Sequence, residues 1–147
     1  MLTVIEKVLF LQDVDIFANT ATEDLAHIGA ITEEITYKSE IEIFHEDDIP
    51  DAMYMVIEGK VRIHHQGKDI MIAKPKDVFG TWALFDDEPR VATATTLENS
   101  CLLRIDREDF YDLLADHSRI TQGILKTLSK RLRNLLSKVQ INYEKKS

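Results

Sequence analysis

The spacing of apolar residues changes twice along this chain, and that change limits its fold more than any other feature. Over residues 1–31 they recur at the three- and four-residue spacing of amphipathic helices. Over residues 32–105 they alternate with polar residues, and glycine, aspartate and proline separate the short runs. Helical spacing returns over residues 106–147. We therefore predict an α+β fold: a jelly-roll-like antiparallel β-barrel flanked by N-terminal helices and a long C-terminal helix.

Local signals predict the ends of several elements. Thr22 resembles the cap of a second N-terminal helix. Asp106 is a candidate N-cap, followed three residues later by Asp109 as in a loose capping box. Ser118 is the best candidate N-cap of the last helix, which has no proline before about Tyr143. Alternation predicts half-buried strands through Ile35, Tyr37, Ile41, Ile43, Met53, Met55, Ile57, Val61, Ile63, Ile70 and Ile72.

The composition fits one domain over residues 1–147. Acidic residues outnumber basic ones, 26 against 18, which disfavours nucleic-acid binding because phosphate contacts dominate such affinity. The one cysteine, Cys101, excludes an internal disulfide, fits a reducing compartment and lies in an apolar run that predicts a buried strand. No apolar run approaches the length of a membrane span. We expect a cytoplasmic module, alone or within a larger protein, that by itself contacts neither nucleic acid nor membrane.

Residues 79–93 (FGTWALFDDEPRVAT) have the features of an anion-binding loop. Gly80 allows a turn that opens a short apolar segment, and Arg90 enters a β-type run. Exposed N–H groups at a helix start favour negative charge, and a guanidinium adds a permanently charged, bidentate fork. The segment predicts an anion pocket and favours a phosphate.

The order of these parts resembles the cyclic nucleotide-binding domain family over nearly the whole chain. Residues 53–61 (MYMVIEGKV) resemble its strand–glycine–strand signature, and residues 77–80 (DVFG) with the later Pro89-Arg90 resemble its phosphate-binding cassette. Residues 105–110 (IDREDF) and 130–133 (KRLR) resemble parts of its closing helices. The resemblance implies a regulatory sensor that couples capture of cAMP, cGMP or a related phosphate ligand to movement of the C-terminal helix. It implies ligand contacts from Phe79, Gly80, Thr81, Trp82, Ala83, Arg90, Val91 and Ala92.

Several positions depart from the family pattern. Ligand-binding members usually carry a glutamate that accepts a hydrogen bond from the ribose 2′-OH, where this chain has Thr81. Losing that charge-assisted bond would cost about 1.5–3 kcal/mol. Trp82 stands where a smaller leucine is frequent, so we expect it in the core or crowding the pocket. Leu135 and Leu136 stand where transcription activators read adenine through hydroxyl groups. Turn glycines usual in the family are replaced by Ser39, Asp47 and Lys76.

Arg90 stands at the position of the family's phosphate-binding arginine, and two interpretations of it are open. In the first, an anion binds there. In the second, a carboxylate permanently neutralises it, since an unpaired buried cation is costly. The candidate acids for the second interpretation are Asp86, Asp87 and Glu88.

The last helix carries a heptad-like seam. Its members are spaced three, four, three and four residues apart: Leu125, Leu128, Leu132, Leu135 and Val139. This spacing favours a partner helix, so we predict a homodimer through the seam. The alternative is that the seam packs on the barrel of its own chain. Ile120, Ile124 and Leu136 offer a second apolar face.

Other chemistries find little support. The candidate metal ligands of a cupin-like site are His45, Glu46, His64 and His65. Adjacent strand residues point to opposite faces, so His64 and His65 do not converge and we predict no metal. No Ser–His–Asp or Cys–His set has local support, so we predict no catalytic residues and no enzyme. Besides the sensor, two alternatives stay open: a nucleotide-independent dimerisation or assembly module, and the sensor part of a truncated transcription regulator. The latter needs a helix-turn-helix beyond Ser147.

Overall fold

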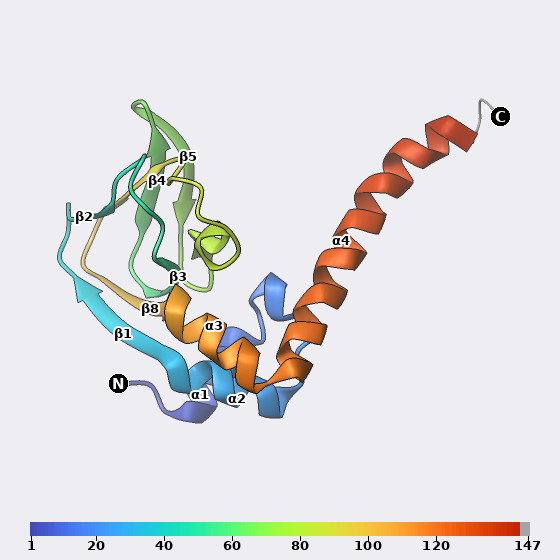
Figure 1. Cartoon of the computed structure of the whole chain (residues 1–147). Helices are drawn as coiled ribbons and strands as arrows, with labels where there is room; N and C mark the ends of the chain where they lie inside the picture. Colours follow the sequence, from blue (N-terminus) through green and yellow to red (C-terminus); the bar gives the residue numbers. More distant parts are fainter. Residues whose placement is uncertain (145–147) are drawn as a thin grey trace.

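Two four-stranded antiparallel sheets form the centre of the molecule (Figure 1). The computed structural model describes residues 1–144, with side chains described through residue 139. The strand orders are β1-β8-β3-β6 in one sheet and β2-β7-β4-β5 in the other. The strands are β1 Thr32–Tyr37, β2 Glu42–Phe44, β3 Ala52–Glu58, β4 Val61–His65, β5 Lys68–Ala73, β6 Val78–Phe79, β7 Thr93–Thr96 and β8 Ser100–Asp106. This architecture confirms the predicted α+β fold and its jelly-roll-like sheets.

The N-terminal residues form helices, as their spacing predicts. These are α1 Val4–Leu11, the 3₁₀ turn η1 Asp15–Phe17 and α2 Thr22–Ile31. A capping box starts α1, in which Thr3 Oγ1 accepts from the N–H of Glu6 and the Glu6 carboxylate accepts from the N–H of Thr3. The prediction that Thr22 caps α2 is wrong: Ala21 is the N-cap, and its carbonyl accepts the first helical N–H groups.

Two helices follow the sheets: α3 Arg107–Asp116 and α4 Ser118–Glu144. The predicted cap at Asp106 is confirmed, because its carboxylate accepts from the N–H groups of Glu108 and Asp109. Ser118 is already the first helical residue rather than the N-cap, since only His117 separates the two helices. None of the described helices is both long and apolar enough to span a membrane.

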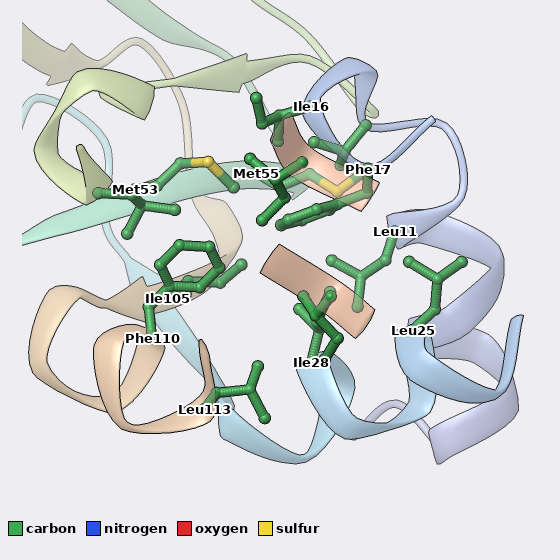
Figure 2. Close-up of a cluster of buried hydrophobic side chains, with 14 of the residues drawn as sticks. Leu11, Ile16, Phe17, Leu25, Ile28, Met53, Met55, Ile105, Phe110 and Leu113 are labelled. Carbon is green, nitrogen blue, oxygen red and sulfur yellow. The ribbon is translucent and has the colours of Figure 1, made fainter. Parts of the chain in front are cut away.

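Strand β3 is buried on both faces, and this divides the core into two clusters. One face contributes Met53 and Met55 to a helix-side cluster with Phe17, Ile28 and Phe110 (Figure 2). The other face contributes to a barrel cluster, whose members are Ala52, Tyr54, Val56, Val61, Ile63, Ala73, Phe79, Ala92, Ala94 and Leu102. The predicted half-burial of this strand is therefore wrong, because β3 is central in its sheet and the helices cover its outer face.

The edge strand β5 also departs from the predicted pattern. Ile70 is exposed, whereas Ala73 is buried opposite Val61 of β4. Only β4 pairs with β5, so β5 is an edge strand, and both Ile70 and Met71 are exposed on it. Cys101 is half-buried on β8 rather than buried, and its partial burial raises the pKa of its thiol.

Tight turns with positive φ join the strands. Gln66 and Gly67 have φ values of 50° and 80° and close the β4–β5 hairpin, as a two-residue turn of this kind requires. Asp47 and Lys76 adopt φ values of 72° and 78°, so they replace turn glycines as predicted. The prediction that Ser39 replaces a turn glycine is wrong by one residue, because the neighbouring Glu40 has the positive φ.

Candidate functional site

A pocket of about 300 Å³ lies beside β6 and the segment that leads to β7. The predicted site residues that line it are Phe79, Gly80, Trp82, Ala83, Arg90, Val91 and Ala92. We call it the arginine pocket. Asp86, Glu88 and Pro89 also line it, and Phe44, Pro50 and Ile63 contribute from β2, the β2–β3 loop and β4. Sequence reasoning missed these three, because no local pattern connects them with residues 79–93.

Glycine is required at position 80 for two reasons. Its φ of 74° is left-handed, and it precedes the 3₁₀ turn η2, Thr81–Leu84. A Cβ at this position would also lie 2.7 Å from Arg90 Nη1 and 3.3 Å from the carbonyl oxygen of Ala52. Gly80 therefore allows the backbone to pass directly against the guanidinium.

Arg90 is buried to 7 % exposure and held by neighbours from distant segments. Nη2 donates to the carbonyl oxygen of Ala52 at 2.8 Å and to Asp51 Oδ1 at 3.2 Å. Cζ lies 3.9 Å from the centroid of the Phe44 ring, within the range of a cation–π contact. The Arg90 carbonyl accepts from the Asp47 N–H, and the Arg90 N–H donates to the Asp48 carbonyl. These two bonds fix the backbone of Arg90 against the Asp47–Asp48 turn.

The acid that pairs with Arg90 is Asp51, and not one of the three acids that precede the arginine in sequence. The expectation that Asp86, Asp87 or Glu88 neutralises it is wrong. Asp87 instead pairs with Arg107 at 3.0 Å. Asp51 is an exposed carboxylate that also bonds Arg104, so its negative charge is shared and partly solvated.

The guanidinium nevertheless keeps unused hydrogen-bonding capacity. Within the part of the chain that the structure describes, Arg90 Nε is buried and has no hydrogen-bond partner. Nη1 makes one long contact, 3.5 Å, to the carbonyl oxygen of Gly80. Burial lowers the pKa of Arg90, and the nearby Asp51 carboxylate acts in the opposite direction. A buried cation with an unused donor is suited to an anion, which accepts that donor and adds negative charge.

Thr81 lies apart from the arginine pocket, in a second cavity of about 330 Å³. Its neighbours there include Asp15 and Ile16 of η1 and Leu128 and Arg131 of α4. Thr81 is therefore the one predicted site residue that does not line the arginine pocket. Leu135 and Leu136 are exposed on α4 and line neither cavity.

Trp82 lines both cavities and is 72 % exposed. The expectation that it belongs to the core is wrong. The short turn η2 directs Ala83 and Leu84 into the protein, which leaves the preceding indole on the surface. The alternative expectation, that Trp82 lies at the pocket, agrees with its position in the pocket lining.

The first turns of α4 are attached to the N-terminal helices by polar contacts. Arg119 forms a bidentate pair with the buried Asp24, at 3.0 and 2.7 Å. Asn19 donates to Thr127 Oγ1 at 2.8 Å and accepts from Lys130 Nζ at 3.0 Å. An ion pair between Asp15 and Arg131 follows one turn later. These contacts set the position of α4 relative to α2 and η1.

The apolar seam of α4 is exposed along its length. Ile120 and Ile124 are buried, whereas Leu125, Leu128, Leu132, Leu135 and Val139 are exposed. The alternative that the seam packs on its own barrel is therefore wrong for the residues that the structure describes. A homodimer through the seam stays a prediction.

The histidines near the barrel tip have separate partners. His64 Nε2 lies 3.1 Å from Thr95 Oγ1, and His65 Nδ1 lies 3.0 Å from a carboxylate oxygen of Glu46. His45 contacts the backbone carbonyl of Glu46 instead of its carboxylate. Among the described residues, no group of three or more histidine, cysteine or acidic side chains is arranged to hold a metal.

Comparison with known proteins gives consistent matches. The family model described as "Cyclic nucleotide-binding domain" matches residues 34–117, more than half of the chain. A CRP-like cAMP-activated global transcriptional regulator of Mycobacterium tuberculosis is 33 % identical over 96 residues, which are 62 % of this chain and 43 % of that protein. The chain thus spans less than half the length of that relative.

Solved structures share the fold. The N-terminal domain of a transcriptional regulator from Streptomyces coelicolor is 30 % identical with a TM-score of 0.81, covering 86 % of this chain and 94 % of that one. The catabolite activator protein of Thermus thermophilus is 26 % identical with a TM-score of 0.67, covering 88 % and 63 %.

Proposed function

This chain belongs to the cyclic nucleotide-binding domain family, and on that premise we propose that it is a regulatory sensor. In this proposal the arginine pocket captures a cyclic nucleotide or a related phosphate ligand, and the capture repositions α4. The observation that carries the proposal is the buried guanidinium of Arg90, whose Nε has no partner within the described chain. The names of relatives, such as the cAMP-activated regulator of M. tuberculosis, support the ligand class.

An anion can bind to Arg90 while the ion pair between Arg90 and Asp51 stays intact. Nη2 is occupied by Asp51 and the Ala52 carbonyl, whereas Nε is unused and Nη1 has only its long contact to Gly80. A phosphate oxygen that accepts from Nε satisfies a buried donor, whose desolvation otherwise costs about 1–3 kcal/mol. Arg90 then serves as the anchor of the anion, while its Nη2 keeps the bonds to Asp51 and to the Ala52 carbonyl.

The turn η2 provides a physical route from the ligand to α4. Gly80 and Trp82 lie at the arginine pocket, whereas Thr81 and Trp82 face Leu128 and Arg131 across the second cavity. A ligand that draws η2 toward Arg90 changes the surface on which α4 rests. Such a switch requires the ligand to prefer one position of α4, because equal affinity for both shifts no population.

Calorimetric titration with cAMP and with cGMP tests the sensor, using the wild type, Arg90→Gln and Arg107→Gln. Arg107 is the matched control, because it pairs with Asp87 and does not line the pocket. We expect binding to wild type and Arg107→Gln, with at least a tenfold loss in Arg90→Gln, or about 1.4 kcal/mol. Absence of heat with both nucleotides, or equal binding to Arg90→Gln, contradicts the proposal.

The second candidate function is a nucleotide-independent dimerisation or assembly module. It is favoured by one observation, the exposed apolar seam of α4. Sedimentation with and without a saturating nucleotide separates the two functions. A sensor changes its shape or assembly when ligand is added, whereas an assembly module sediments identically in both conditions.

A third possibility also follows from the comparisons. This chain covers 94 % of the N-terminal domain of the S. coelicolor regulator, so it suits the sensor part of a longer transcription regulator. In that case DNA binding belongs to a segment outside residues 1–147, in line with the acidic charge of the module itself.

A further inference from the structure

The walls of the arginine pocket are mostly apolar and carry one cation, Arg90, and two carboxylates, Asp86 and Glu88. From this chemistry we infer that the ligand is an organic monoanion with an apolar body, aromatic or branched aliphatic, rather than a nucleotide with polar ribose and base. The inference rests on the proposed function in one respect, namely that Arg90 holds the anion. It differs from the proposed function in that the rest of the ligand, apart from its anionic group, makes hydrophobic contacts.

Much of the wall of the pocket is hydrocarbon surface. Phe44, Ile63, Phe79 and Val91 line the pocket together with small alanines. Among the described residues that line it, none is a serine, threonine, asparagine, glutamine, tyrosine or histidine. Three side chains there carry charge, namely Arg90, Asp86 and Glu88, and Trp82 adds a largely apolar ring.

A nucleoside body finds few partners in such a pocket. Ribose hydroxyls and base edges are polar, and burying them without hydrogen bonds costs free energy. Thr81, which stands where ligand-binding family members usually carry glutamate, lies at the second cavity. The position after Arg90 carries Val91, which has no hydroxyl to donate to an anion. An apolar body instead gains free energy from each unit of surface that it buries there.

The charges around the pocket limit the ligand to one negative charge. Arg90 is the only cation among the described lining residues, and Asp51 already balances part of its charge. Asp86 and Glu88 line the same pocket, and the N–H of Glu88 bonds the Asp86 carboxylate, which holds these two acids together. A second negative charge on the ligand would be repelled by both. A carboxylate and a phosphodiester each satisfy this requirement.

The test uses 4-phenylbutanoate as an apolar carboxylate probe, its neutral amide 4-phenylbutanamide, and cAMP as a phosphodiester with a polar body. Trp82 is the only tryptophan in the chain and lines the pocket, so its fluorescence reports occupancy directly. We expect 4-phenylbutanoate to bind at least tenfold more tightly than both the amide and cAMP. We expect Arg90→Gln to remove that preference for the carboxylate.

A surface position tests the apolar wall without risk to the fold. Val91 is exposed although it lines the pocket, so Val91→Ser should leave folding intact and weaken 4-phenylbutanoate binding several-fold. Val4→Ser is the matched control, because Val4 is an exposed valine on α1 away from the pocket. Glu88→Gln should strengthen binding of phenyl phosphate, a dianion near neutral pH, more than binding of 4-phenylbutanoate.

The outcomes separate this inference from the proposed function. Tighter binding of cAMP than of 4-phenylbutanoate, lost in Arg90→Gln, overturns the apolar ligand class and leaves the nucleotide sensor standing. Arg90-dependent binding of 4-phenylbutanoate without cAMP binding supports the inference and removes the nucleotide from the proposed function. If neither probe binds through Arg90, both the inference and the sensor are wrong.

Discussion

The two halves of α4 lie in different surroundings: the exposed apolar seam runs through both, but the first half also has a second apolar face, which is buried. In the first half Ile120 and Ile124 are buried in the helix-side cluster. In the second half Leu132, Leu135 and Val139 are exposed, and this half projects away from the two sheets (Figure 1). The first half of α4 therefore stabilises the fold, whereas the second half presents an apolar surface on which another molecule can pack.

The boundary between the halves coincides with the last polar contacts to the N-terminal helices. Asn19 bonds Thr127 and Lys130, and Asp15 pairs with Arg131. Beyond Arg131 the structure shows no further ion pair or hydrogen bond from a described α4 side chain to the rest of the chain. If α4 moves as proposed for the sensor, the movement either breaks these contacts or bends the helix near them.

The largest expected effect on the free energy of unfolding comes from a substitution in the buried first half of α4. Ile124→Ala removes apolar atoms from the helix-side cluster and leaves a cavity, so we expect a loss of about 2–5 kcal/mol in the free energy of unfolding. Leu135→Ala is the matched change in the exposed half and should alter it by less than about 0.5 kcal/mol. Urea denaturation at low protein concentration measures both. Equal losses would show that the halves do not differ as described.

Gly123→Ala is expected to have the next largest effect on stability, because Gly123 brings α4 directly against the segment between η1 and α2. A Cβ there would lie 2.8 Å from the carbonyl oxygen of Asn19, a backbone atom that cannot turn aside. Alanine favours a helix over glycine, yet we expect Gly123→Ala to destabilise the protein by about 1–3 kcal/mol through overpacking. Ser129→Ala, at an exposed α4 position, is the control and should be neutral. A stabilised Gly123→Ala would mean that α4 moves freely away from Asn19.

The polar contact at the boundary is expected to contribute less. Asn19→Ala removes the hydrogen bonds to Thr127 and Lys130, for an expected loss of about 0.5–1.5 kcal/mol. Thr127 keeps its bond to the carbonyl oxygen of Gly123, which limits the cost. Hydrogen exchange should show earlier opening of the first half of α4 in this variant, while the strands keep their protection. Unchanged exchange in α4 would show that Asn19 does not hold the helix.

The sequence was sufficient to predict the fold because helix and strand spacing differ strongly along the chain. It could not predict that β3 is buried on both faces, since that depends on helices far away in sequence covering the sheet. The exposure of Trp82 was not predictable either. The family resemblance suggested burial, because leucine is frequent at this position, whereas the geometry of η2 places Ala83 and Leu84 inside and the indole outside.

In the candidate site, too, some features follow from the local sequence, and others depend on residues that are distant along the chain. Gly80 and Arg90 lie in one continuous segment, so their proximity to a common pocket follows from local sequence. Asp51 and Phe44 approach Arg90 from other strands, and their roles as counter-ion and ring partner need the tertiary fold. Three nearer acids in sequence were better candidates by distance along the chain, but none of them pairs with the arginine.

The smallest expected effect on the fold, and the sharpest test of the outer half of α4, comes from its seam. Leu132→Lys places a charge in the middle of an exposed apolar row, so the free energy of unfolding of the isolated chain should change by less than about 0.5 kcal/mol. If two chains pair through Leu125, Leu128, Leu132, Leu135 and Val139, the buried lysines oppose association and sedimentation shifts toward monomer. Arg133→Lys, a change on the same helix outside the seam, should leave assembly unaltered. A dimer that persists in Leu132→Lys would assign the interface to another surface and leave the exposed half of α4 for a different partner.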